Sequence, residues 1–171
     1  HMKYVVTLLA SCALAGCIGG GSGSGPQTTM NNTLPSGAPI SSPHQGYDRS
    51  FDGMLNGVRM QNGAGSLNFD ARLARAAQTH SNDMLAMGRL THTGSDGSDA
   101  GQRIRREGYD WITWGENVAR GYQTEEAVLN GWVNSPGHQA NNINPAFEDF
   151  ALAKAGSGSN LYWTLVFGTE R

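Results

Sequence analysis

Gly115-Glu116-Asn117-Val118-Ala119 is the stretch that best organises the rest of the sequence. Leu90-Thr91-His92-Thr93 precedes it and Asn134-Ser135-Pro136-Gly137-His138 follows it, and we expect each segment at a boundary between predicted elements. Each contains a histidine or a glutamate, which are side chains that bind metals, move protons or form charge-assisted hydrogen bonds. These three segments are therefore the candidates for the chemistry of the protein.

Four helices are predicted around these segments, because apolar residues recur there at intervals of three and four. Three of them are expected to start at a residue whose side-chain oxygen can cap a helix, and three are expected to end at a glycine. The helices are one that contains Phe51 to Val58 and ends at Asn62-Gly63, one from Asp70 to Gly88, a short one from Ser98 or Asp99 to about Glu107, and one that starts at Thr124.

The C-terminal part changes to a strand-like pattern. Residues 150–155 and 161–167 are two such runs, separated by a Gly- and Ser-rich connection at residues 156–160. Residues 111–114 are a candidate third strand. The predicted fold class is therefore α+β, with a small antiparallel sheet sandwiched between helices.

The charge balance excludes nucleic acid as a partner. The 171-residue chain has a formal net charge of -2 and a pI near 6.2, and its only lysines are Lys3 and Lys154. A nucleic-acid surface needs clustered cations to neutralise phosphates. Arg103, Arg105 and Arg106 are the one local basic cluster, and we interpret them as a solvated helix face without a function.

Residues 1–17 predict a cloning remnant followed by a secretory signal peptide. Lys3 is a minimal positive region, and residues 4–15 are apolar but too short to span a bilayer. Leu14-Ala15-Gly16-Cys17 resembles a bacterial lipobox, which makes Cys17 the predicted lipidation site and mature N-terminus. Leu9-Ala10-Ser11-Cys12 fits the same pattern but leaves a very short apolar segment. A plain secreted protein is the alternative.

Residues 18–46 predict a flexible linker. No Asp, Glu, Lys or Arg occurs between Ile18 and Gln45, and the segment is built mainly from Gly, Ser, Pro, Thr and Asn. Such a composition cannot bury a core. The folded domain is predicted for residues 47–171, and it must be held by packing because both cysteines of the chain precede it.

The three polar segments, with Tyr162-Trp163-Thr164 and Phe167-Gly168, resemble the CAP family, also called the SCP or PR-1-like family, in its bacterial form. The resemblance covers the chain from about Tyr47 to its end, and the order and spacing of the motifs are specific. It implies an α-β-α sandwich with a cleft into which two histidines and acidic residues project.

The site that the resemblance implies consists of His92, Glu116 and His138. Many eukaryotic members of the family carry a second glutamate three residues after a tryptophan, and here Ser135 stands at that place after Trp132. This departure argues against a mechanism that needs two carboxylates.

Three interpretations of this site remain open. Two neutral imidazoles, His92 and His138, can bind Zn²⁺ with Glu116 as a base or an outer partner. Glu116 can instead orient a histidine as a general base towards Ser135, although no G-x-S-x-G motif is present. The third interpretation is a buried His-Glu-His network that holds three loops together.

The expected function is a binding or scaffold module on the bacterial envelope. Its partners are the membrane, through lipid on Cys17, and a small ligand, a peptide or a cell-wall component. The outer membrane is the default location because Ile18 rather than Asp follows the cysteine. The alternative function is a zinc-dependent hydrolase, such as a peptidase, that uses His92, His138 and Glu116.

Other chemistry-bearing side chains are expected to be structural. His80 shares the apolar face of the second predicted helix, which favours a core histidine over a ligand. Asp96-Gly97 is typical of a turn. The tryptophans are predicted to build the core and the cleft wall; they are Trp111, Trp114, Trp132 and Trp163.

Overall fold

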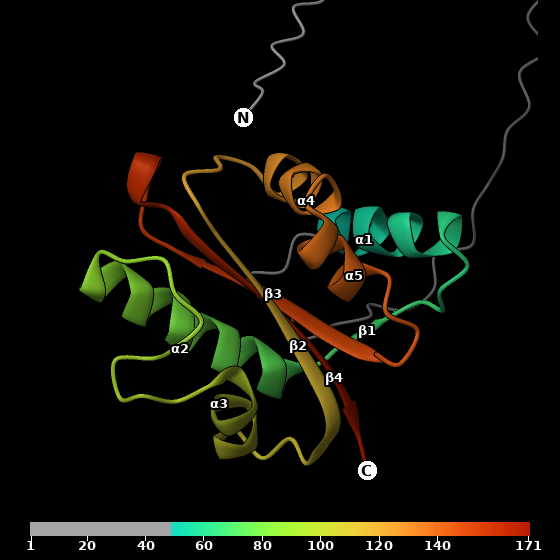
Figure 1. Ribbon diagram of the computed structural model, residues 1–171, viewed down its shortest axis with the longest axis horizontal. Helices are drawn as coiled ribbons and strands as arrows, with labels where there is room; N and C mark the ends of the chain where they lie inside the picture. Colours follow the sequence, from blue (N-terminus) through green and yellow to red (C-terminus); the bar gives the residue numbers. More distant parts are fainter. Residues whose placement is uncertain (1–48) are drawn as a thin grey trace, which may run out of the picture. The chain divides into compact units, whose positions relative to one another are not determined.

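The computed structural model describes residues 49–171 (Figure 1). The predicted signal peptide, lipobox and linker lie outside the described residues. The elements in chain order are α1 (Arg49–Gln61), β1 (Asn68–Phe69), α2 (Ala71–Met87), α3 (Ala100–Arg106), β2 (Trp111–Arg120), α4 (Glu125–Val133), α5 (Pro136–Asn142), β3 (Asp149–Ala155), a 3-10 turn η1 (Gly158–Asn160) and β4 (Tyr162–Glu170).

The four strands of the described part form one sheet in the order β1-β3-β4-β2. β4 pairs antiparallel with β3, as the sequence predicts, and also antiparallel with β2, whereas the two-residue β1 pairs parallel with β3. The sheet is therefore mixed. β2 is also longer than the predicted strand at residues 111–114, so the segment 115–119 lies within a strand and not at an element boundary.

Helices cover both faces of the sheet, which confirms the predicted α+β sandwich. α2 and α3 lie on one face, and α1, α4 and α5 lie on the other (Figure 1). Successive side chains of a strand point to opposite faces. Phe150 and Leu152 of β3 accordingly enter the core beneath α1 and α4, whereas Ala151 and Ala153 enter the core beneath α2.

α2 begins and ends where its sequence predicts. The Asp70 side chain accepts hydrogen bonds from the backbone N–H groups of Arg72 and Leu73, and Gly88 adopts the left-handed conformation with φ 64°. The buried face of the helix includes Leu73 and His80. The helix therefore ends at a fixed point, from which the chain leads directly into the segment that contains His92.

α5 is a helix that the sequence analysis did not predict, because Pro136 and Gly137 are typical of a turn. Ser135 is its N-cap residue and Pro136 occupies the first turn. Proline is compatible with that place, since the first N–H groups of a helix have no acceptor within the helix. His138 thus lies on the first turn of a short helix.

A buried arginine links α1 to two connecting segments of the chain. Arg59 of α1 is fully buried. Its guanidinium donates to the backbone carbonyls of Gly65, Asn142, Asn144 and Phe147 at 2.6 to 3.2 Å. The single side chain therefore links α1 to the connection between α5 and β3.

β2 is an edge strand of the sheet, and two side chains bond to its backbone. Asn141 Nδ2 donates to the carbonyl of Glu116 at 3.3 Å, and Trp132 Nε1 donates to the carbonyl of Val118 at 3.4 Å. α4 and α5 are thereby attached to the strand that contains Glu116.

Candidate functional site

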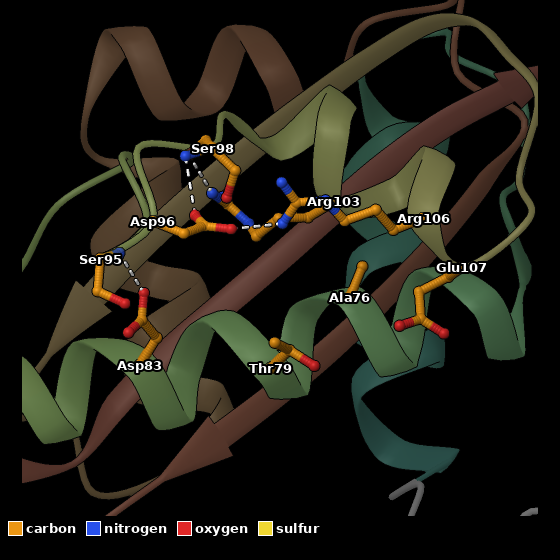
Figure 2. A pocket seen from close by; sticks show the side chains of 9 residues that line it. All are labelled: Ala76, Thr79, Asp83, Ser95, Asp96, Ser98, Arg103, Arg106 and Glu107. Atoms are coloured by element: carbon orange, nitrogen blue, oxygen red, sulfur yellow. Dashed lines mark hydrogen bonds and ion pairs between the residues drawn. The ribbon is translucent and has the colours of Figure 1, made fainter.

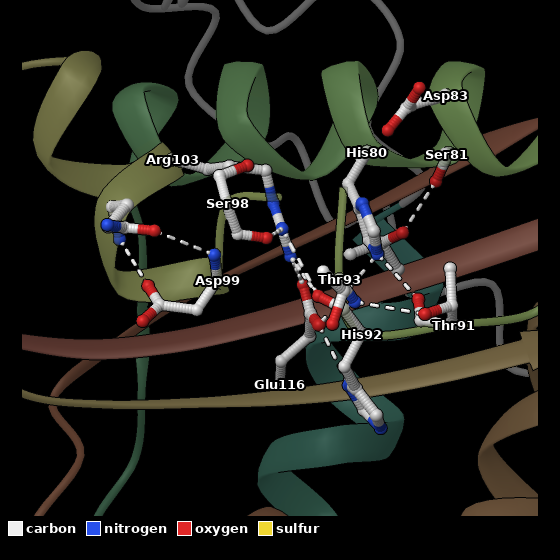
Figure 3. Close-up of polar contacts among 12 residues, drawn as sticks. His80, Ser81, Asp83, Thr91, His92, Thr93, Ser98, Asp99, Arg103 and Glu116 are labelled. Carbon is white, nitrogen blue, oxygen red and sulfur yellow. Dashed lines mark hydrogen bonds and ion pairs between the residues drawn. The ribbon is translucent and has the colours of Figure 1, made fainter. Parts of the chain in front are cut away.

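Glu116 is the centre of the polar cluster (Figure 3). Its side chain projects from β2 and is 2% exposed. His92 Nδ1 lies 2.8 Å from Oε1, and Arg103 Nη2 donates to Oε2 at 2.6 Å. A buried carboxylate needs such partners to offset the loss of hydration. Both oxygens of Glu116 are therefore engaged.

Arg103 is a site residue that the sequence analysis missed. The solvated face predicted for the arginine cluster is wrong for Arg103, which is buried, and correct for the exposed Arg105 and Arg106. Arg103 lies three residues after buried Ala100 on α3, so both side chains share the inner face of the helix. Its guanidinium neutralises Glu116 in the interior.

Arg103 also fixes the loop that contains His92. Its Nη1 donates to the carbonyl of Ser98 at 2.8 Å, and both terminal nitrogens donate to the carbonyl of His92 at 3.2 Å. The arginine therefore holds α3, the His92 loop and β2 together at one point. Figure 3 shows the guanidinium directed towards Glu116 from α3.

His80 is buried as predicted, and it belongs to the same cluster. Its Nε2 donates to the carbonyl of Thr91 at 2.8 Å and lies 3.9 Å from Glu116 Oε1. Within the described residues, its Nδ1 has no hydrogen-bond partner. Burial lowers the pKa of His80, so the neutral ring with the proton on Nε2 is favoured.

His92 and His138 stand in different electrostatic surroundings. The His92 side chain is 60% exposed, and its hydrogen bond to Glu116 raises its pKa. His138 Nδ1 lies 2.9 Å from Ser135 Oγ. Burial and, to a lesser extent, the charge of His92 lower the pKa of His138. The charge of His92 thus acts on the pKa of His138, and in each ring the bonded nitrogen is Nδ1.

The geometry of the side chains bears on two of the interpretations of the site, the serine nucleophile and the metal site. Glu116 orients His92, whereas Ser135 bonds to His138, so no single Glu-His-Ser chain is formed. No group of three or more His, Cys, Asp or Glu side chains within residues 49–171 is arranged to hold a metal ion. Within residues 49–171, the ring nitrogens of these histidines that carry no hydrogen bond are Nε2 of His92, Nε2 of His138 and Nδ1 of His80.

Asn117 attaches α5 to the site. Its Nδ2 donates to the carbonyl of His138 at 3.1 Å and to Asn142 Oδ1 at 3.0 Å, and its Oδ1 accepts from Asn141 Nδ2 at 2.8 Å. Asn117 and Asn142 are fully buried. The Glu-Asn pair of β2 therefore fixes the position of both histidine-bearing segments, one through each side chain.

A small cavity of about 220 Å³ lies beside Arg103 (Figure 2). Its charged side chains already have partners. Asp83 accepts from the backbone N–H of Ser95, and Asp96 accepts from that of Ser98 and pairs with Arg106. The predicted turn at Asp96-Gly97 is confirmed by these bonds and by the φ of 81° at Gly97. We interpret this cavity as part of the scaffold.

The comparisons with known proteins agree with this fold. The model of the cysteine-rich secretory protein (CAP) family matches residues 53–167, which include all the histidines and acids of the site. The chain is 30% identical over 142 residues to YkwD of Bacillus subtilis, described as an uncharacterized protein, and the match covers 83% of the chain and 54% of the relative. The chain thus spans about half the length of this relative.

Solved structures show the same sandwich. An extracellular protein of Bacillus anthracis that contains an SCP domain has a TM-score of 0.66 and 25% identity, over 71% of this chain and 40% of that one. An outer surface protein of Borrelia burgdorferi has a TM-score of 0.66 and 22% identity, over 72% of this chain and 92% of that one. At this identity the likeness shows the fold alone. With its family match, its sandwich and its motif residues, the chain belongs to the CAP, or cysteine-rich secretory protein, family.

Proposed function

We propose that this protein is an extracytoplasmic CAP domain that binds a cell-wall component in the cleft bordered by His92, Glu116 and His138. One observation carries the proposal: both oxygens of Glu116 are bonded, one to Arg103 and one to His92. A general base must be free to accept the proton that it abstracts. A carboxylate held in this way positions a ligand-binding histidine and is poorly suited to acid-base catalysis.

The proposed location follows from the relatives and from the N-terminal residues. The two solved neighbours are described as an extracellular and an outer surface protein. None of the helices formed by residues 49–171 is long and apolar enough to cross a membrane. We propose lipid on Cys17, in the outer membrane, as the anchor, with residues 18–46 as the tether between membrane and domain.

The anchor predicts a modified N-terminus. Expressed with its own signal in a bacterium, the protein should be found in the membrane fraction, and mass spectrometry should find an acylated peptide that starts at Cys17. A Cys17→Ser variant should move to the soluble fraction, and Cys12→Ser should not. Wild-type protein that is soluble and unmodified would contradict the anchor.

Purified peptidoglycan sacculi test the proposed function. We expect the protein to sediment with sacculi without releasing soluble amino groups or reducing ends. The His92→Ala/His138→Ala variant should lose about tenfold in affinity or more, because it removes both imidazoles that border the cleft. His44→Ala, in the predicted linker, is the matched control. Failure to sediment, or equal sedimentation of wild type and double variant, would contradict the proposal.

Metal-assisted hydrolysis is the second candidate function, and the Nδ1 bonds of both histidines favour it. A carboxylate behind a ligating histidine fixes the ring in many zinc sites, as Glu116 does for His92. Zn²⁺ bound by the Nε2 atoms of His92 and His138 would supply a water with a lowered pKa. The same sacculi with added Zn²⁺ decide the case: release of fragments that requires both histidines would establish the hydrolase.

A further inference from the structure

A second hollow lies between α3 and the first residues of β2. Its volume is about 570 Å³, within the ~300–1,000 Å³ of small-molecule sites. It shares no residue with the proposed cleft of His92, Glu116 and His138. We call it the α3–β2 hollow. Its lining consists of two tryptophans and four polar side chains: Asp99, Gln102, Arg105, Arg106, Trp111 and Trp114.

A β-bulge brings the two tryptophans to the same side of β2. Residues three apart in a regular strand point to opposite faces. The register of β2 against β4 shifts between Trp111 and Thr113, and an extra residue at such a shift redirects the side chains that follow. A Cβ on Gly101 of α3 would contact both indoles, so both lie against the same helix. The exposed residue between them is Ile112.

The indole pair is fixed before any ligand arrives. The rings are 6.3 Å apart at 73°, an edge-to-face arrangement. Trp111 Nε1 donates to the carbonyl of Gly101 at 2.9 Å, and the Arg105 guanidinium lies 4.5 Å from the centre of the Trp111 ring. Trp111 and Trp114 are only partly buried, unlike Trp132 and Trp163 in the core. Such preorganisation lowers the entropic cost of binding.

The polar side chains of the hollow are oriented but retain free hydrogen-bonding atoms. Asp99 and Gln102 form a capping box at the start of α3, in which Asp99 Oδ1 and Gln102 Oε1 each accept a backbone N–H. Within the described part of the chain, Asp99 Oδ2 and Gln102 Nε2 have no hydrogen-bond partner. The hollow therefore offers one acceptor and one amide donor beside an aromatic surface.

Of the two arginines that line the hollow, one has no ion-pair partner within residues 49–171. Arg106 pairs with Asp96 outside the hollow. Arg105 is exposed and makes no ion pair or hydrogen bond with any residue from 49 to 171, so its five donors are available. A guanidinium of this kind binds a carboxylate through two parallel hydrogen bonds.

We propose that the α3–β2 hollow binds a saccharide that carries a carboxylate. The C–H face of a sugar ring packs against the electron-rich face of an indole, which is the surface that the Trp111–Trp114 pair offers. Sugar hydroxyls donate and accept, so they match the acceptor of Asp99 and the amide donor of Gln102. Arg105 receives the carboxylate. A neutral sugar leaves the charge of Arg105 without a partner.

Two soluble oligosaccharides test this site. A hyaluronan tetrasaccharide contains glucuronate, and chitotetraose is a neutral comparator of the same length. We expect isothermal titration to show the hyaluronan fragment binding at least about tenfold more tightly than chitotetraose. Tryptophan emission should shift on binding, since Trp111 and Trp114 are the partly exposed indoles of the domain.

Variants separate this site from its surroundings. Trp114→Ala should weaken both sugars about tenfold, and Arg105→Ala should remove the preference for the acidic one. Arg105 is exposed, so its variant tests the site even if Trp114→Ala does not fold. Arg120→Ala is the matched control, because Arg120 stacks on Tyr162 elsewhere. His92→Ala/His138→Ala should bind both sugars as wild type does, which keeps this test independent of the cleft.

Three results for the hollow itself, and one for the cleft, would overturn the proposal. The first three are no binding of the hyaluronan fragment at millimolar concentration, equal affinity for the acidic and the neutral sugar, and unchanged affinity in Arg105→Ala. Loss of binding in the double histidine variant would assign the sugar to the cleft and would equally remove the α3–β2 hollow as its site.

Discussion

Glu116→Ala is expected to lower the free energy of unfolding by about 3–5 kcal/mol at pH 7, because it leaves a buried cation without its anion. Arg103 Nη2 lies 2.6 Å from the missing oxygen and is enclosed by α3 and the His92 loop. Urea denaturation measures the effect as a lower midpoint with an unchanged slope. A variant that unfolds at the same midpoint as wild type would show that the pair contributes nothing.

Two further variants identify the cause. Glu107→Ala removes a carboxylate that pairs with Arg75 at 2.7 Å on the surface, and it should cost less than about 1 kcal/mol. Arg103→Met combined with Glu116→Gln removes both buried charges and should regain a large part of the stability lost in Glu116→Ala. A double variant as unstable as the single one would locate the loss in packing and not in charge.

Urea denaturation at different pH values should show opposite pH dependences of stability for His92 and for the other two histidines. The folded state favours protonated His92, so this contribution is complete below the ordinary pKa near ~6.5 and is lost as the pH rises through the raised pKa. His80 and His138 favour the neutral form, so their contribution is complete above ~6.5 and is lost as the pH falls through their lowered pKa. NMR titration should find the pKa of His92 lower in Glu116→Ala than in wild type.

Arg59→Ala is expected to be nearly as destabilising, by about 3 kcal/mol, because several buried carbonyls lose their donors together. The side chain is fully buried and donates to four carbonyls of two connections. Burial lowers the pKa of Arg59, but an arginine remains charged. The change should appear in thermal and urea denaturation alike.

Arg59→Lys and Arg75→Ala control this prediction. Lysine keeps the charge but has only three donors on one nitrogen, so it cannot reach all four carbonyls and should recover part of the stability. Arg75 is exposed, and its removal should have an effect below about 1 kcal/mol. An Arg59→Ala variant within that same limit would mean that water replaces the guanidinium without cost.

Local chemistry accounts for what the sequence predicted about the fold. Asp70 and Gly88 define α2 because a capping side chain and a left-handed residue are properties of single positions. β1 has only two residues, and its parallel pairing with β3 depends on a strand about 80 residues later. No local pattern predicts such a pairing. α5 was missed because a proline that begins a helix and one that belongs to a turn have the same neighbours in sequence.

Part of the polar cluster was predictable from the sequence, but Arg103 and the contacts between the residues were not. His92 and Glu116 were expected together from the family resemblance, and the structure joins them by a hydrogen bond. The role of Arg103 depends on which face of a seven-residue helix meets β2, and that face carries too few residues for its periodicity to be obvious. The contact of His80 with the Thr91 carbonyl likewise arises only when the loop folds back on α2.

The bonds that Asn141 and Trp132 make to β2 also bear on association between molecules. An edge strand with unpaired carbonyls can template a strand from another chain and so begin aggregation. At Glu116 and Val118 these acceptors are already occupied by side chains of the same domain. At these two carbonyls β2 is therefore closed to the addition of a strand from another molecule.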